Sequence, residues 1–395
     1  MAKAPLSPSE GFTLLELIIS MAIIAVLSLV LIGVTNQAAA TLHYTTGKIE
    51  QFREARTAFD AMSSRISQAT LNTYFDYFDN STPPQQRTPA NSATFVPARY
   101  GRASELRFLS GQANDGSAAA IGNFTDAQNA TAQRITHCVF FHAPLGVVDS
   151  TQVSSGNTNY HGFDNVLNAW GYYVEFRDDA ATRPPIFTAA FPPPRFRFRL
   201  MEFRQPSQAL EIYQDIARGN AAPYSWYQNN VNANGAPVHV LAENIIALIV
   251  HPQLAQEDIN YLQQQGASTT ELTSDYRYDT TQSNPNPVFN PKNQLPPVLQ
   301  IAMVAIDEAS AARLNLNANS TNIFGLVWKA PASGAAKFTS TSNYESDLYY
   351  QNPASPGTVN MNSLEKTLIN LHLNYRIFTA NVSIRGAKWS RSQNF

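Results

Sequence analysis

Histidine and cysteine are the side chains that most readily bind metal ions or act as nucleophiles, and this chain of 395 residues has seven histidines and one cysteine. His137 and His142 flank an apolar run that begins with Cys138. On a β-strand, side chains an odd number of positions apart point to opposite faces, so His137 would share a face with neither His142 nor Cys138. No pair of histidines has the spacing of a zinc motif. We therefore expect no metal centre and no cofactor, and the lone cysteine excludes an internal disulfide.

Acidic side chains offer a second route to chemistry. The neighbours Asp76/Asp79 and Asp178/Asp179 could contribute to a calcium site, but the Asp-x-Asp-x-Asp-Gly spacing of a calcium loop is absent. The sequence also lacks a Gly-x-Ser-x-Gly nucleophile elbow, a phosphate-binding loop and a dinucleotide fingerprint. We expect ordinary loop carboxylates and a protein that is not an enzyme.

The run Arg195-Phe196-Arg197-Phe198-Arg199 is the most unusual candidate for a binding surface. Strict alternation on a strand would place Arg195, Arg197 and Arg199 on one face and the aromatic rings on the other. Such a basic face could bind an acidic partner subunit or a phosphate backbone. The alternative is a half-exposed strand whose arginines form ion pairs and whose rings are buried. The net charge of −2 gives no domain-wide basic footprint, so we expect nucleic acid not to be a partner.

The elements that would position these residues begin with an apolar stretch over residues 12–34. As a helix it would be about 34 Å long, enough to cross a hydrocarbon core of about 30 Å. It could be a cleaved signal peptide ending at the small residues 38–40, although such signals are shorter and this stretch contains Glu16. It could also be a simple signal anchor, with Thr13 and Glu16 forming a capping box.

A third interpretation explains more of the segment. The sequence Gly11-Phe12-Thr13-Leu14-Leu15-Glu16, heading an otherwise uncharged helix, resembles the N-terminus of type IV prepilins and pseudopilins. The resemblance implies that a prepilin peptidase cleaves after Gly11 and N-methylates Phe12. A charge inside an apolar helix costs about 3 kcal/mol. In this family Glu16 would offset that cost by pairing with the amino terminus of Phe12 on a neighbouring subunit.

Two features depart from the family pattern. Glu10 precedes the glycine where a basic residue is common, and Lys48 and Arg53 lie just beyond the apolar stretch. The positive-inside rule therefore does not support a cytoplasmic leader, and the orientation rests on the resemblance. The resemblance implies a single-pass protein of the inner membrane, with a head in the periplasm or on an extracellular filament.

Beyond the apolar stretch the pattern stays helical and then becomes strand-like. Apolar residues at 3-4 spacing form one helical stripe: Ile49, Phe52, Ala55, Phe59, Met62, Ile66 and Ala69. We expect one helix to about residue 73, then strands over 105–109, 135–141, 172–177, 195–204, 244–250 and 298–306, a helix over 364–371, and a last strand pair through 377–384. The expected organisation is a leader 1–11, a transmembrane half-helix 12–34, an amphipathic half-helix 35–79, a Pro-rich connection 80–97 and a β-rich head 98–395.

Further pieces narrow the resemblance. Residues 51–62, 242–245 and 295–298 are similar to J-type minor pseudopilins of type II secretion, and 69–77, 104–109 and 170–176 look like Verru_Chthon cassette protein C, a prepilin-like family. The resemblance implies an α+β fold in which a long N-terminal helix packs on a β-rich head. It also implies a minor subunit of an assembly related to type II secretion or type IV pili, with other pilin-like subunits as partners.

A membrane-tethered binding module for carbohydrate or protein is the alternative function. Clustering of exposed Tyr224, Trp226 and Tyr227 in one groove of the head would favour this module.

Overall fold

The computed structural model describes residues 13–82, 84–114, 120–124, 132–148, 165–180, 193–213, 224–231, 237–266, 270–283, 290–326, 337–353, 355 and 357–390. Gly11 and Phe12, where the sequence predicts cleavage, lie outside these ranges. The chain divides into two compact units, Met1–Gln51 and Phe52–Phe395, and helix α1 (Leu14–Ile66) begins in the first and ends in the second.

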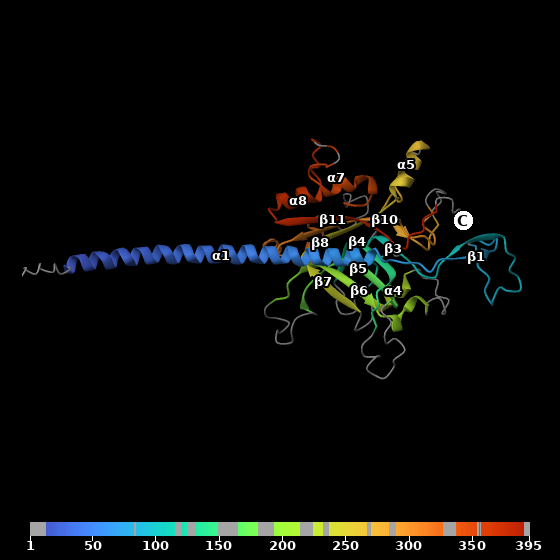
Figure 1. Ribbon diagram of the computed structural model, residues 1–395, viewed down its shortest axis with the longest axis horizontal. Coiled ribbons are helices and arrows are strands. Elements are labelled where there is room, and N and C mark those ends of the chain that lie inside the picture. The colour runs from blue at the N-terminus through green and yellow to red at the C-terminus, as the bar shows by residue number, and fades with distance from the viewer. Residues whose placement is uncertain are drawn as a thin grey trace, which may run out of the picture. The chain divides into compact units, whose positions relative to one another are not determined.

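The second unit is built around an antiparallel sheet of six strands in the order β7-β6-β5-β4-β3-β9 (Figure 1). Its strands are β3 (Leu109–Gln112), β4 (Gln133–Pro144), β5 (Leu167–Arg177), β6 (Arg197–Gln205), β7 (Val238–Glu243) and β9 (Tyr278–Asp279). The central strands β4 and β5 are buried along almost their whole length. Both faces of the sheet are therefore covered, which is why these strands are apolar at successive positions and do not alternate.

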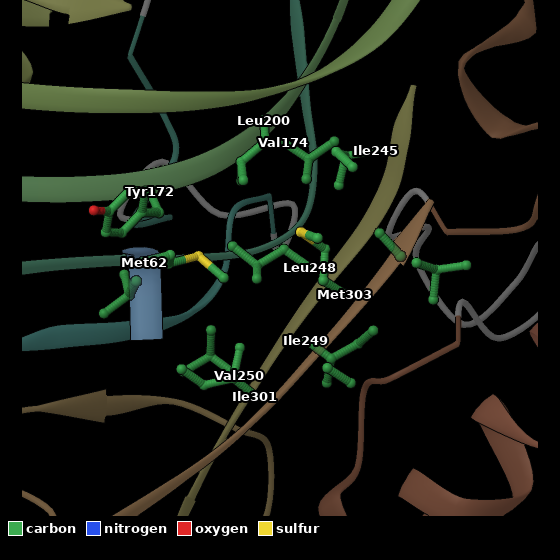
Figure 2. Close-up of a cluster of buried hydrophobic side chains, with 14 of the residues drawn as sticks. Met62, Tyr172, Val174, Leu200, Ile245, Leu248, Ile249, Val250, Ile301 and Met303 are labelled. Atoms are coloured by element: carbon green, nitrogen blue, oxygen red, sulfur yellow. The ribbon is translucent and has the colours of Figure 1, made fainter. Parts of the chain in front are cut away.

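A second antiparallel sheet, in the order β11-β10-β8, shares the main hydrophobic core with one face of the first. Its strands are β8 (Ile245–Gln253), β10 (Val298–Ile306) and β11 (Tyr375–Ser383). Figure 2 shows side chains from α1, β5, β6, β8 and β10 meeting in this core, among them Met62, Tyr172 and Leu200. A smaller cluster covers the opposite face of the six-stranded sheet and includes α4 (Ser225–Val231).

The other helices with both ends among the described residues are short. They include α5 (Gln256–Gln264), α6 (Glu308–Arg313), α7 (Tyr344–Leu348) and α8 (Leu364–Asn370), with 3-10 turns at Ser207–Ala209, Ser320–Asn322 and Thr341–Asn343. Side-chain caps explain where two of them begin. Asp307 accepts a hydrogen bond from the backbone N–H of Ser310 at 2.8 Å, and Ser363 accepts one from Lys366 at 3.2 Å. Each cap satisfies a backbone donor that the first helical turn leaves free.

The predicted apolar stripe on α1 is confirmed from Ala55 to Ile66, where the residues at helical spacing are buried in the main core. Phe52 is partly buried against the same core, while the side chain of Ile49 lies outside the described residues. The predicted extension of the helix to residues 73–79 is wrong. Tertiary hydrogen bonds take over where α1 stops: the N–H of Arg385 donates to Ser67 O at 2.9 Å, and the N–H of Thr70 donates to His142 O at 2.9 Å.

A two-stranded antiparallel hairpin follows the helix and projects from the rest of the head (Figure 1). It consists of β1 (Tyr74–Phe78) and β2 (Arg99–Ala103). The Pro-rich segment 80–97 therefore connects two strands of one hairpin and not the helix with the head, which corrects the predicted connection. Aromatic residues at four of the five β1 positions favour a strand over a helix there.

Most of the other strand predictions agree with the structure, and the α+β fold class is confirmed. The predicted strand 105–109 is wrong, since only Leu109 lies in a strand. The side chain of Asn72 provides the reason: its Oδ1 accepts hydrogen bonds from the backbone N–H groups of Glu105 and Leu106 at 3.1 and 3.0 Å, so these groups cannot join a ladder. The predicted last pair is the single strand β11.

Candidate membrane anchor and assembly site

The N-terminal end of α1 is closed by a reciprocal set of hydrogen bonds. The backbone N–H and hydroxyl of Thr13 donate to Glu16 Oε2 at 2.9 and 3.0 Å, and the N–H of Glu16 donates to Thr13 Oγ1 at 3.3 Å. This arrangement is the predicted capping box, which satisfies backbone donors that the first turn leaves free. Glu16 Oε1 has no partner among the described residues, so the carboxylate can cap its own helix and still accept a hydrogen bond from another chain.

The stretch Leu14–Ala39 has the length and hydropathy of a membrane span. Its most apolar window of 18 residues has a mean hydropathy of 3.0. At 1.5 Å per residue the 26 residues of the stretch extend about 39 Å, more than the roughly 30 Å of a hydrocarbon core. None of this window is buried, and the large apolar side chains along it are 49–78% exposed. A monomer in water rarely leaves so much contiguous apolar surface bare. Glu16 is the only acidic or basic side chain in the stretch.

The second half of α1 is held to the six-stranded sheet by a polar cluster beside the apolar stripe. Glu202 on β6 forms an ion pair with Arg65 and accepts hydrogen bonds from Trp170 Nε1 at 3.0 Å and the Tyr172 hydroxyl at 2.9 Å. The Arg65 guanidinium also lies 5.1 Å from the centre of the Trp170 ring. Burial alone would lower the pKa of Arg65, but Tyr172 and Glu202 outweigh it and raise that pKa, so the guanidinium stays charged.

Neighbouring strands of the six-stranded sheet determine whether the predicted basic strand exposes its arginines. Arg134 on β4, Glu175 on β5, Arg199 on β6 and Glu243 on β7 are successive cross-strand partners. Arg134 Nη2 lies 3.4 Å from Glu175 Oε1, and Arg199 Nε lies 3.1 Å from Glu243 Oε1. Charges of alternating sign thus run across four strands, and we call this row the charge ladder. The two carboxylates therefore flank Arg199, and that arginine is buried.

Arg197 and Arg195 both face Glu308, the first residue of α6. Arg197 Nη2 lies 2.6 Å and Arg195 Nη1 lies 3.9 Å from Glu308 Oε1. Burial would raise the pKa of Glu308, but hydrogen bonds from Arg197 and Asn244 outweigh it and lower that pKa. Only Arg195, with 67% of its side chain exposed, remains open to solvent. The predicted basic partner surface is therefore wrong for Arg197 and Arg199, and the ion-paired alternative describes them better.

The residues around the single cysteine are buried and structural. His137 Nδ1 accepts a hydrogen bond from the N–H of Val250 at 3.0 Å, so the ring proton lies on Nε2, which is 3.1 Å from Phe338 O. A β-bulge at Thr136, with a φ of 57°, turns His137 toward the edge of β8, where its ring satisfies the N–H of Val250. Cys138 and His142 lie on the other side, as predicted. Among the described residues, no group of three histidine, cysteine or acidic side chains is placed to hold a metal ion.

The three aromatic residues that would have indicated a binding groove are buried in the smaller cluster. The Tyr227 ring stacks on Phe140 with 3.9 Å between ring centres, and its hydroxyl donates to Ile121 O at 2.7 Å. The Trp226 ring lies 4.4 Å from the ring of His142. Tyr224 hydrogen-bonds to Asp279 at 3.0 Å. These residues, which lie in α4 or directly before it, are part of the smaller cluster and do not line an exposed groove.

Sequence reasoning missed a different aromatic group, which lies on the β1–β2 hairpin. Phe75, Tyr77, Tyr100 and Arg102 share one face of this hairpin, because Phe75 is paired with Arg102 and Tyr77 with Tyr100. We call these four residues the aromatic face. The three rings are 54–60% exposed. The signal in the sequence was the run Tyr74-Phe75-Asp76-Tyr77-Phe78, which has more aromatic residues than one buried strand face can hold.

A family model matches the N-terminal segment of the chain. The family described as the prokaryotic N-terminal methylation motif matches residues 6–32, a range that contains Gly11, Phe12 and Glu16. Neither the curated proteins nor the solved structures contain a significant match to the chain. The N-terminal segment is therefore of the prepilin type, and together with the apolar helix it fits a membrane-anchored protein with a globular head.

Proposed function

We propose that this prepilin-type chain is a structural subunit, of the minor pilin or pseudopilin kind, in an envelope assembly related to type II secretion or type IV pili. Prepilin peptidase would cleave it after Gly11 and methylate Phe12. The mature protein would be held in the inner membrane by α1, with its head in the periplasm or on an extracellular filament.

The observation that carries this proposal is the chemistry of the first helix. An apolar helix with a single carboxylate near its start is costly to place in lipid unless that carboxylate finds a partner. In the structure Glu16 uses Oε2 to cap its own helix, which leaves Oε1 for a second donor. The methylated amino group of Phe12 on a neighbouring subunit would be such a donor, and pairing with it would set the register between subunits.

The size of the head and a local likeness support the finer parts of the proposal. The head comprises most of a 395-residue chain, and a subunit of this bulk repeated every few ångströms along a filament would crowd its neighbours, which favours a minor role such as initiation or capping. The likeness of residues 69–77, 104–109 and 170–176 to Verru_Chthon cassette protein C supports the same placement. We also propose that the subunit is not an enzyme, with movement driven by a separate ATPase.

The test is the amino-terminal mass of the protein recovered from membranes of a host that expresses prepilin peptidase. We expect a chain that starts at N-methylated Phe12. The variant Gly11→Val should keep its leader, because the branched side chain enters the cleavage position. Gly33→Ala is the matched control: a Cβ added there meets nothing within 4 Å. An intact Met1 in the unaltered protein would indicate a simple anchor, and a start at Thr41 would indicate a secreted protein; either result contradicts the proposal.

The alternative, a tethered binding module, loses the feature that would have favoured it. Tyr224, Trp226 and Tyr227 are buried in the smaller cluster. The exposed aromatic face of the hairpin is a separate feature and is compatible with a structural subunit.

A further inference from the structure

The three-stranded sheet has two edges, and the edge formed by β8 is sealed from Leu248 to Pro252. The backbone N–H of Leu248 donates to Thr136 Oγ1 at 3.1 Å, and that of Val250 donates to His137 Nδ1 at 3.0 Å. Both N–H groups therefore point away from β10 and are satisfied by side chains of β4. Pro252, the next residue in this alternation, has no N–H to leave unpaired. This part of the edge offers no donor to another strand.

The other edge of the same sheet, β11, has no such cover among the described residues. Two hydrogen bonds fix which of its backbone groups face β10: the N–H of Ile384 donates to Pro297 O at 3.1 Å, and that of Asp307 donates to Asn374 O at 3.2 Å. Alternate residues of an antiparallel strand bond to one neighbour. The even-numbered residues of β11 therefore bond to β10. The N–H groups that point outward, for which no described residue supplies an acceptor, are those of Tyr375, Ile377, Thr379, Asn381 and Ser383.

Strand β11 also lacks the features that usually keep a sheet edge from pairing. Natural edge strands are short, contain proline or lysine, or carry a bulge. β11 has nine residues, and its register with β10 continues without a shift from Tyr375 to Ser383. Its one charged side chain is Arg376, and the guanidinium of this residue lies 5.8 Å from the Phe52 ring on α1. The arginine thus packs on the helix, and the edge is open to another strand.

The geometry of this edge specifies its ligand. Outward N–H and C=O groups recur at every second residue, about 6.8 Å apart along the strand. A second extended polypeptide carries the complementary groups at the same repeat. Phe378 and Val382 on one face of β11 are buried in the main core, while Thr379 and Asn381 on the other face are exposed. An added strand would continue both faces, so a segment with alternating apolar and polar side chains fits this edge.

The direction of α1 favours a different subunit over a second copy of this chain. The Phe52 ring lies beside Arg376, and the Phe59 ring centre is 5.9 Å from that of Phe378, so this part of α1 runs in the same direction as β11. Antiparallel pairing of β11 with the β11 of a second copy would be two-fold symmetric and would reverse one α1 relative to the other. Subunits anchored side by side in one membrane need these helices to run the same way.

We propose that β11 is a docking edge, to which a different subunit of the assembly adds an extended segment with alternating apolar and polar side chains. The three-stranded sheet would thereby become four-stranded. The inference rests on the proposed function, because it requires that the chain be a subunit of an assembly. It adds a contact made by the head to the contact that Glu16 would make in the first helix.

The first experiment compares backbone variants of the full chain, tagged and recovered from membranes of its native host, with co-purifying subunits quantified by mass spectrometry. Asn381→Pro removes an outward N–H that β10 does not use, and proline is tolerated at such edge positions. Asn381→Ala is the matched control, because it removes the same side chain and keeps the N–H. We expect the proline variant to lower partner recovery about tenfold or more and the alanine variant to stay within about twofold. Ser383→Pro repeats the test at a second outward position.

Hydrogen–deuterium exchange of the unaltered protein tests whether the contact is strand pairing. In the isolated chain, the outward amides of Thr379 and Asn381 should exchange rapidly, whereas the amide of Ala380, which faces β10, should exchange slowly. In the recovered assembly the two outward amides should slow by about tenfold or more, because each would then donate to the added strand. This measurement needs no variant, so it decides the matter even if proline disturbs the fold.

Loss of partners in both proline variants but not in Asn381→Ala, together with protection of the outward amides in the assembly, supports the proposal. Unchanged recovery in the proline variants, equal loss in Asn381→Ala, or unchanged exchange overturns it. Protection of the isolated chain that increases with its concentration also overturns it, in favour of a second copy. A chain that keeps Met1 or recovers no other subunit overturns the proposed function as well. A chain that starts at methylated Phe12 and keeps its partners despite the proline overturns the strand pairing alone.

Discussion

Lowering the pH from 7 to 5 is expected to destabilise the folded head through His137 and His142. Both rings are fully buried, and burial lowers the pKa of each from 6.5 to about 4. For His137 the geometry adds a reason, because a second ring proton on Nδ1 would face the N–H of Val250 that now donates to it. The folded state therefore binds fewer protons than the unfolded state between pH 6.5 and 4.

The sign and size of the effect follow from these values. A folded-state pKa below that of the unfolded chain gives stability that is fully present above pH 6.5 and is lost as the pH falls toward 4. Each histidine would cost about 2 kcal/mol between pH 7 and 5, and the pair about 4 kcal/mol. Burial raises the pKa of Glu345 and Asp347, and these two carboxyls act in the opposite direction. The test is therefore the difference between variants in the stability lost from pH 7 to pH 5. The total change of stability with pH is not the test.

The assay is urea unfolding of the full chain in nonionic detergent at pH 7 and pH 5, followed by tryptophan fluorescence, because Trp170 and Trp226 are buried. Glutamine does not titrate in this range and can still accept from Val250 and donate to Phe338, so His137→Gln should reduce the pH-dependent loss by about 2 kcal/mol. His239→Gln, at an exposed position where partial burial and Arg204 also lower the pKa of the ring, should reduce this loss less than His137→Gln does. The reasoning is refuted if a His137→Gln, His142→Gln double variant loses as much stability at pH 5 as the unaltered protein.

Three further changes test other parts of the structure. Glu16→Gln keeps a capping side chain but removes the charge. We therefore expect normal processing with loss of incorporation into the assembly, measured by co-purification of partner subunits. Unchanged incorporation would contradict the pairing of Glu16 with the amino group of Phe12 on a neighbouring subunit. Glu202→Ala leaves the charge of Arg65 without its partner and should lower the free energy of unfolding by about 3–5 kcal/mol. A loss below about 1 kcal/mol would show that the polar cluster does not stabilise the packing of α1 on the sheet. Gly171→Ala brings a Cβ within 2.2 Å of the Phe140 ring and should cost about 1–3 kcal/mol in the same urea assay; an unchanged midpoint would mean that the core yields there freely.

Local patterns predicted the parts of this protein that depend on neighbours in the sequence. The capping box at Thr13 and Glu16 involves residues three positions apart, and the structure contains it. Strands such as β8 and β10 are long apolar runs bounded by polar residues, so their position could be predicted without their partners. The stripe on the second half of α1 has a helical period and is buried as expected.

Partners distant in the sequence account for what could not be predicted. Arg197 is buried because Glu308, more than a hundred residues later in the chain, lies beside it. The charge ladder needs strand register across β4 to β7, and no single strand reveals that register. Asn72 ended the predicted strand at 105–109 by hydrogen bonds across 33 and 34 positions. Burial of Tyr227 likewise depends on its stacking against Phe140.

Because Cys138 is buried, its rate of chemical labelling reports how often the head opens. The chain has no other thiol, and this one lies in the cluster beneath α4 with no exposed surface. An alkylating reagent can reach it only after that layer separates from the sheet, so the rate of labelling measures how often the layer opens. A cysteine introduced at an exposed position would be labelled first and selectively, because Cys138 is out of reach in the folded protein. A single probe can therefore be attached without removing the natural thiol.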